Sequence, residues 1–172
     1  DLVAALPGVT IGALFGPQHG FRSDVQDNMV ETEDTRHESL DVPIYSLYGE
    51  TREPTDVMLA NLDLLVIDLQ DVGTRVYTYV QTMTNWLRAC ATKSIPVVVC
   101  DRPNPLGGVT VEGPVLEPGF ESFVGLFPVP IRHGLTIGEL ARLCNDAFGL
   151  HATLEVLPLE GWRREMYHDD TG

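Results

Sequence analysis

Short apolar runs alternate along this chain with longer segments whose apolar residues recur every three or four positions. The runs have the length of β-strands rather than of helices. Two of them, LLVIDL at 64–69 and PVVVC at 96–100, are almost continuously apolar, which is typical of strands buried on both faces of a parallel sheet. The run at 152–157 alternates and predicts an edge strand. The predicted strands are residues 10–15, 44–48, 64–69, 96–100 and 152–157.

Three segments carry the helical pattern. A short helix is predicted over 55–61, and a longer one over 136–148, where Thr136 and Glu139 have the spacing of a capping box. The longest helix is predicted over 75–93 because its apolar residues form one stripe. The residues of this stripe are Val76, Val80, Met83, Leu87 and Cys90.

Alternating strands and helices predict βαβ units and therefore an α/β fold, with a mostly parallel open sheet and helices on both faces. We expect the strands at 10–15, 64–69 and 96–100 to be parallel neighbours in one sheet, with the helix at 75–93 packed on one face. The whole chain, residues 1–172, is interpreted as a single domain.

Charge narrows the class of partner. Eleven Lys and Arg against twenty-five Asp and Glu give a net charge of −14, so no basic surface is available for nucleic-acid phosphates or anionic membranes. No apolar run has the length of a membrane-spanning helix. Many acids lie in 22–42, which we interpret as a long solvated loop. They are Asp24, Asp27, Glu31, Glu33, Asp34, Glu38 and Asp41.

Cysteines and histidines give little support for a metal site. Cys90, Cys100 and Cys144 are odd in number, lack C-x-x-C spacing and lie in apolar stretches, so buried free thiols are favoured over a disulfide or a metal site. A site from His19, His133 and an aspartate is the less favoured alternative. The glycine-rich nucleotide motifs, the serine-hydrolase elbow and the H-E-x-x-H motif are missing from the sequence.

Polar, constrained loops follow three of the predicted strands, at 16–20, 68–75 and 101–108. Because ligands of open α/β sheets bind outside the carboxyl ends of the strands, we expect these loops to form one cleft. Carboxylates, amides and aromatic faces are the mixture that binds sugars. In the plainer alternative, glycine and proline only turn the chain, and Asp68 or Asp101 caps a helix or braces a loop. The residues expected to line this cleft are Gln18, His19, Asp68, Gln70, Asp71, Arg75 and Asn104.

Six sequence blocks in fixed order cover nearly the whole chain and closely resemble the NamZ-type exo-β-N-acetylmuramidases, a bacterial family formerly known only as a domain of unknown function. The blocks are LFGPQHGFR (14–22), PIYSLYGETREPT (43–55), DLQDVGTRVYTY (68–79), DRPNPLGG (101–108), VEGPVL (111–116) and SFVGLFPVPIRHGLTIGELA (122–141).

This resemblance implies a Rossmann-like N-terminal domain, followed in complete members by a smaller C-terminal domain, with the active site in the cleft between them. It implies exo-lytic release of N-acetylmuramic acid from the non-reducing ends of peptidoglycan-derived fragments, without a cofactor. Complete members are much longer, so we expect this chain to be an incomplete fragment that lacks the C-terminal domain. A periplasmic or secreted location is favoured over a cytoplasmic one.

The first loop departs from the family pattern. It commonly reads P-E-H-G, and that glutamate is the leading catalytic candidate, whereas this chain has Gln18. Glycoside hydrolysis usually needs two carboxyl groups, and an amide cannot transfer a proton at neutral pH. Either activity is impaired or the acid is another residue. The catalytic candidates are Gln18, His19, Asp68, Asp71 and Glu112, and the substrate-binding candidates are Gln70, Arg75, Tyr77, Asp101, Arg102, Asn104 and His133.

Two other functions stay open from the sequence. The first is a non-catalytic domain of the same fold that binds peptidoglycan sugars and has lost the acid. The second is an unrelated flavodoxin-like binding module, which requires the ordered blocks to be a coincidence.

Overall fold

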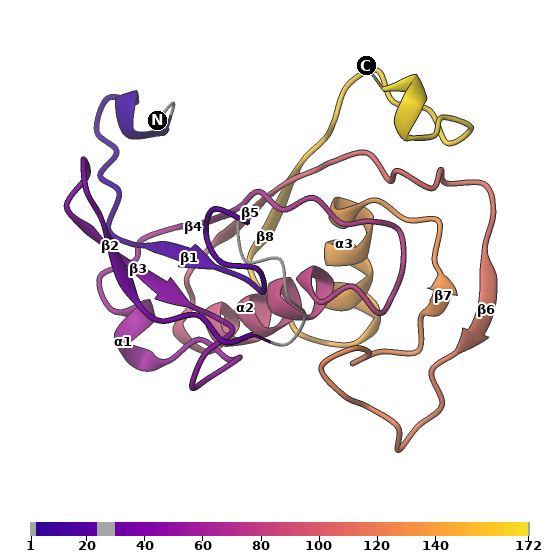
Figure 1. The fold of residues 1–172 in the computed structure, drawn as a ribbon, viewed down its shortest axis with the longest axis horizontal. Helices are drawn as coiled ribbons and strands as arrows, with labels where there is room; N and C mark the ends of the chain where they lie inside the picture. Colours follow the sequence, from indigo (N-terminus) through magenta and orange to yellow (C-terminus); the bar gives the residue numbers. More distant parts are fainter. Residues whose placement is uncertain (1–2, 24–29, 172) are drawn as a thin grey trace. The chain divides into compact units, whose positions relative to one another are not determined.

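A computed structural model describes residues 3–23 and 30–171, which divide into two compact units, Asp1–Leu62 and Asp63–Gly172 (Figure 1). The first unit contains η1 (Val3–Ala5), β1 (Leu14–Gly16), β2 (Thr35–His37), β3 (Val42–Ser46) and α1 (Asp56–Leu59). The second contains β4 (Leu65–Ile67), α2 (Tyr79–Lys93), β5 (Val97–Cys100), β6 (Glu112–Val115), β7 (Pro130–Arg132), α3 (Ile137–Ala147), β8 (Leu154–Leu157) and η2 (His168–Asp170).

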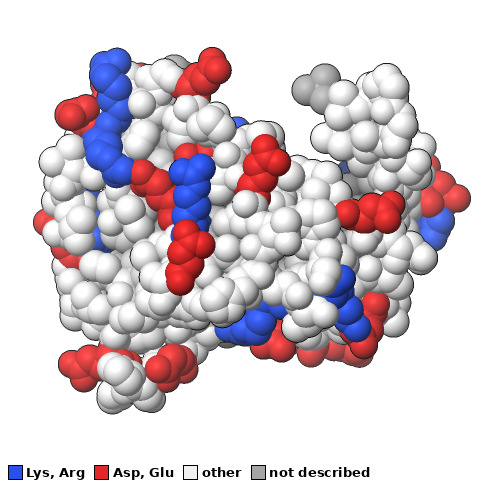
Figure 2. Space-filling view, turned by 180° about the vertical axis from the view of Figure 1, so that it is seen from behind, with Lys and Arg blue, Asp and Glu red and all other residues white. Residues whose placement is uncertain are grey.

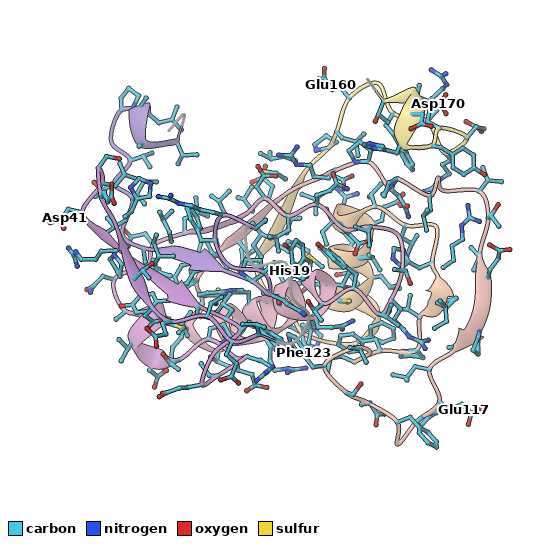
Figure 3. All side chains as sticks on the ribbon, in the orientation of Figure 1. His19, Asp41, Glu117, Phe123, Glu160 and Asp170 are labelled. Atoms are coloured by element: carbon cyan, nitrogen blue, oxygen red, sulfur yellow. The ribbon has the colours of Figure 1, made fainter. Side chains whose placement is uncertain are left out.

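The first unit is built on a three-stranded sheet of order β1-β3-β2, in which β1 is parallel to β3 and β2 is antiparallel to it. The prediction of an unbroken loop over 22–42 is wrong, because β2 lies within it. Its residues are polar and mostly exposed, so apolar periodicity could not reveal this edge strand. Asp24 and Asp27 of that segment lie outside the described residues. Asp41, in the turn between β2 and β3, pairs with Arg36 at 2.8 Å (Figure 3).

The second unit confirms the parallel sheet. β4, β5 and β8 are hydrogen-bonded in that order and all run parallel, with Val66 opposite Val98 and Val98 opposite Glu155. β8 is an edge strand with the alternating burial expected of it. The α/β class is therefore confirmed. The expectation that the strand at 10–15 neighbours β4 and β5 is wrong, because β1 has β3 as its parallel partner in the other sheet.

Two of the predicted helices have close to their expected bounds. α1 has Thr55 as its N-cap, and α3 has the complete capping box between Thr136 and Glu139. α2 begins at Tyr79, later than expected, because the backbone N–H of Arg75 donates to Ile131 of β7 at 2.8 Å. Val76, assigned to the apolar stripe, is consequently 51% exposed, whereas the other four stripe residues are buried.

A small antiparallel sheet of β6 and β7 was not predicted. β6 contains Gly113 and Pro114, residues that are usually read as a turn. Gly113 has φ of +82°, and a Cβ there would lie 2.8 Å from Ile131, so the irregular pairing between Glu112 and Val115 requires glycine. A strand that depends on such an irregularity leaves no alternating pattern in the sequence.

Charge on the surface is mixed. The face in Figure 2 carries basic side chains next to acidic ones rather than in a separate basic patch. In the part of the chain that the structure describes, no helix is both long and apolar enough to cross a membrane.

We expect the three cysteines to differ in reactivity. All are free; Cys90 and Cys144 are buried, and burial raises the pKa of each thiol to about 11. Their thiolate fraction at pH 7 is then roughly 10⁻⁴. Burial and the nearby charge of Asp68 also raise the pKa of Cys100, but this residue is only half-buried and its thiol is more accessible. Iodoacetamide labelling of the native chain, read by mass spectrometry, should modify Cys100 first. Labelling of Cys90 or Cys144 at an equal rate would contradict this, and Cys100→Ser is the control.

Candidate functional site

The turn after β1 carries the first two catalytic candidates. The N–H of Gly20 donates to the carbonyl of Pro17 at 3.0 Å, which closes a tight turn around Gln18 and His19. His19 has φ of +75°, a conformation that only a few per cent of non-glycine residues adopt. Gly16 starts the turn, since a Cβ there would lie 2.7 Å from the nitrogen of Phe21. Gln18 is 5% exposed, at the carboxyl end of a parallel strand.

The loop after β4 buries a carboxylate. Asp71 is 3% exposed, and its Oδ2 accepts a hydrogen bond from the N–H of Gly73 at 2.7 Å. The same oxygen lies 3.3 Å from Nε2 of His133, which is also buried. Oδ1 of Asp71 has no hydrogen-bond partner among the described residues. Asp71 therefore combines a fixed orientation with one unused acceptor.

The loops after β4 and β5 are tied together by polar contacts. Arg102 donates from Nε and Nη2 to the two carboxylate oxygens of Asp68, at 2.7 and 2.8 Å. This hydrogen bonding raises the pKa of Arg102. Gln70 donates to the backbone carbonyls of Asp71 and Pro103, at 2.6 and 2.8 Å. The charge of Asp68 is thus neutralised, and both loops are held in register.

Asp101 braces the start of α3. Its Oδ1 accepts from the N–H groups of Gly138 at 2.8 Å and Arg102 at 3.0 Å, and its Oδ2 accepts from the hydroxyl of Thr136 at 3.0 Å. A Cβ on Gly138 would lie only 2.8 Å from the carboxyl carbon, so the helix approaches closely. Both oxygens are occupied, as in the plainer alternative raised by the sequence.

We expect Asp101→Ala to lower the free energy of unfolding by about 3 kcal/mol, because the hydroxyl of Thr136 and the N–H of Gly138 lose a charged acceptor. Urea denaturation followed by circular dichroism measures this change. Asp146→Ala, at an exposed aspartate of the same helix, is the matched control and should change stability by less than about 0.5 kcal/mol. Equal stability of the two variants would contradict the assignment.

Asn104 is also a brace. It is 2% exposed, donates to the carbonyl of Leu135 and accepts from the N–H of Leu106, both at 2.9 Å. Gly73, with φ of +83°, packs directly on it, since a Cβ there would lie 2.4 Å from Oδ1 of Asn104. Asn104 therefore shapes the loop that buries Asp71.

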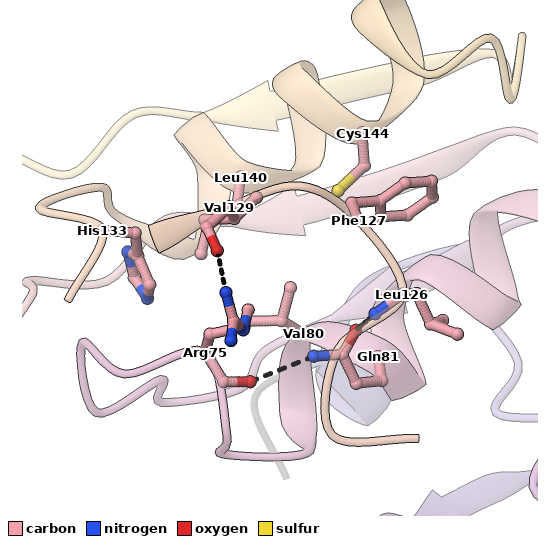
Figure 4. A pocket seen from close by; sticks show the side chains of 9 residues that line it. All are labelled: Arg75, Val80, Gln81, Leu126, Phe127, Val129, His133, Leu140 and Cys144. Atoms are coloured by element: carbon pink, nitrogen blue, oxygen red, sulfur yellow. Dashed lines mark hydrogen bonds between the residues drawn. The ribbon is translucent and has the colours of Figure 1, made fainter. Parts of the chain in front are cut away.

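Arg75 and Tyr77 have partly buried positions. Arg75 donates to the carbonyls of Pro114 and Val129, and with Gln81 and His133 it contributes polar groups to the wall of a small apolar hollow, far smaller than a sugar ring (Figure 4). Tyr77 lies 4.5 Å from Tyr79, between ring centroids. Burial, then hydrogen bonding to Tyr79, raises its pKa far above the usual value.

Glu112 is exposed on β6 and pairs with Arg132 at 2.7 Å. Arg132 also donates to the carbonyl of Leu106. The ion pair therefore links β6 to β7, and the hydrogen bond links β7 to the loop after β5. Sequence reasoning missed Arg132, although its charge opposite a glutamate becomes informative once the β6–β7 pairing is known. Among the described residues, no group of three or more His, Cys, Asp and Glu side chains could hold a metal ion.

The structure thus brings together the polar residues of two of the three predicted loops. Asp68, Gln70, Asp71, Asp101, Arg102 and Asn104 meet at the carboxyl ends of β4 and β5, next to His133. Gln18 and His19 belong to the first unit, and their position in a common cleft with Asp71 stays a prediction.

Comparisons with known proteins agree with one another. The family model described as "Exo-beta-N-acetylmuramidase NamZ, N-terminal" matches residues 1–172. The chain is 50% identical over 171 residues to the peptidoglycan beta-N-acetylmuramidase NamZ of Bacillus subtilis (strain 168), spanning 99% of this chain and 41% of that relative.

Two crystal structures of DUF1343 family proteins from Bacteroides fragilis NCTC 9343 are also similar. One has a TM-score of 0.88 and 42% identity, over 98% of this chain and 42% of the other. The second has a TM-score of 0.76 and 35% identity, over 91% and 41%. The chain therefore spans less than half the length of each of these three proteins.

Proposed function

The chain belongs to the NamZ exo-β-N-acetylmuramidase family, and from this premise we propose that it acts in the release of N-acetylmuramic acid from the non-reducing ends of peptidoglycan fragments. Homology supports placing the chain in a glycoside hydrolase family, since the Bacillus subtilis relative is a peptidoglycan beta-N-acetylmuramidase. The substrate and the mode of attack of this chain are the proposed part.

The observation that carries the proposal is the buried Asp71 carboxylate. Three carboxylates of the second unit are catalytic candidates, and two of them are committed to ion pairs: Asp68 to Arg102 and Glu112 to Arg132. Asp71 makes no ion pair with arginine or lysine among the described residues and has one oxygen without a partner. A sugar hydroxyl, or positive charge developing at the anomeric carbon, would be stabilised by such an oxygen.

Gln18 supports the further proposal that turnover is impaired. It occupies the position where the family resemblance implies a catalytic glutamate, and it is buried at the end of a parallel strand. An amide keeps the size and hydrogen-bonding capacity of glutamate but carries no transferable proton at neutral pH. Sugar binding would persist while proton transfer to or from the glycosidic oxygen is lost.

The same substitution favours a second candidate, a non-catalytic domain that binds peptidoglycan sugars. The two functions are separated by incubating the chain with p-nitrophenyl N-acetylmuraminide and measuring both nitrophenol release and binding by calorimetry. Slow release supports the hydrolase, and binding without release supports the binding domain. Absence of both contradicts the proposal. The matching N-acetylglucosaminide, which lacks the lactyl group, controls for specificity.

A further inference from the structure

Asp71 and His133 form a buried pair from two separate segments of the second unit. The side chain of His133 is 1% exposed and that of Asp71 is 4% exposed. Their closest atoms, Nε2 and Oδ2, are 3.3 Å apart, which is long for a hydrogen bond. Among the described residues, Nε2 makes no hydrogen bond, so its contact with Asp71 is a proximity rather than a formed hydrogen bond. Hydrogen bonds in catalytic sites are often long without substrate and tighten when it binds.

The other ring nitrogen fixes where the imidazole proton lies. The backbone N–H of Leu135 donates to Nδ1 of His133 at 3.1 Å, so Nδ1 must present its lone pair. In a neutral imidazole the single proton is then on Nε2, facing Asp71. A second proton on Nδ1 would point at the N–H of Leu135 and break this hydrogen bond.

Donors reach the Asp71 carboxylate from one side only. Oδ2 receives the N–H of Gly73 and faces Nε2 of His133, whereas Oδ1 receives no donor from the described residues. A buried oxygen without a donor costs free energy, which a ligand hydroxyl or amide N–H at that position would recover.

We propose that His133 is a positioning residue, locked as the Nε2–H tautomer by Leu135, that orients the Asp71 carboxylate and leaves its buried Oδ1 without a protein donor. This inference rests on the proposed function for the identity of the substrate. It assigns His133 a different role from the direct sugar contact expected from the sequence, because both ring nitrogens face protein groups: Nδ1 the N–H of Leu135, and Nε2 the Asp71 carboxylate.

The tautomer can be tested on the chain as it exists. Long-range ¹H–¹⁵N correlation spectra report which imidazole nitrogen carries the proton. We expect His133 to give the neutral Nε2–H pattern, and Asp71→Asn to shift its Nε2 resonance. Asp146→Asn, at an exposed aspartate of α3, should leave that resonance in place. An Nδ1–H pattern, or a resonance that does not respond to Asp71→Asn, would overturn the inference whatever the enzyme's activity.

The positioning role needs a functional readout. In a Gln18→Glu background, His133→Leu should lower kcat for p-nitrophenyl N-acetylmuraminide by roughly 10- to 100-fold with a smaller change in KM, since a misplaced carboxylate loses transition-state contacts. His133→Gln, whose amide N–H can replace Nε2–H, should recover much of that loss. His151→Asn, outside the site, is the control.

Each remaining outcome is decisive. Equal loss of kcat in the Leu and Gln variants at equal melting temperature would show that His133 acts only in packing, and would overturn the inference. If the Gln18→Glu protein neither binds nor hydrolyses the glycoside, the proposed function is overturned. The His133 tautomer and its dependence on Asp71 then decide the inference separately.

Discussion

Replacing Gln18 by glutamate is expected to raise the rate of aryl N-acetylmuraminide hydrolysis by about 10²- to 10⁴-fold, the usual contribution of a positioned general acid or base. The amide and the carboxyl group have nearly the same size, so the turn that closes between Pro17 and Gly20 should keep its shape. The measurement is a pair of initial rates of nitrophenol release, for the Gln18 and Gln18→Glu proteins.

The comparison is best made twice: in this chain, and in a chimera that adds the part of the Bacillus subtilis relative outside the match. Ser23→Asp, which adds a carboxylate to the same loop, controls for the change in charge. Equal rates for the Gln18 and Gln18→Glu proteins in both settings would show that another residue is the acid, with Asp71 and Glu112 the next candidates.

Asp71→Asn in the Gln18→Glu background should lower kcat/KM by about 10²- to 10³-fold, as does removal of other preorganised charge-stabilising groups. The asparagine side chain can still accept from the N–H of Gly73, so the loop should remain folded. Loss of activity would then come from the missing negative charge. Melting temperature, measured in parallel, shows whether the variant is intact.

Glu112→Gln is the matched comparison for Asp71→Asn, at a second candidate carboxylate. Glu112 is exposed and paired with Arg132, so its loss should change kcat/KM by much less than that of Asp71. A larger effect at Glu112 than at Asp71 would contradict the assignment of Asp71 as the functional carboxylate. Asp146→Asn provides a neutral comparison at an exposed site.

Elements with strong local signals could be predicted from the sequence. β4 and β5 are continuously apolar runs of strand length, and the capping box at Thr136 needs only residues three apart. β2 and β6 could not be found this way. β2 is a polar edge strand, and β6 is interrupted by Gly113 and Pro114, so their pairing depends on tertiary contacts.

The candidate site was likewise predictable only where local sequence determines it. The sequence could predict that the loops after β4 and β5 meet, because parallel strands end at one edge. It could not predict what each carboxylate does, since the partners are remote in sequence: Arg102 is 34 residues from Asp68, and Gly138 is 37 residues from Asp101. Asp71 and Asp101 look equivalent in sequence, yet one keeps an unused oxygen and the other none.

The left-handed backbone of His19 places conformational strain in the first loop. A residue with a side chain in this conformation costs about 1 kcal/mol that glycine would not. His19→Gly should therefore make the protein harder to unfold, unless the imidazole contributes more through its own contacts. Urea denaturation of the two proteins measures this balance: equal or lower stability of His19→Gly would show that contacts of the imidazole offset the backbone strain.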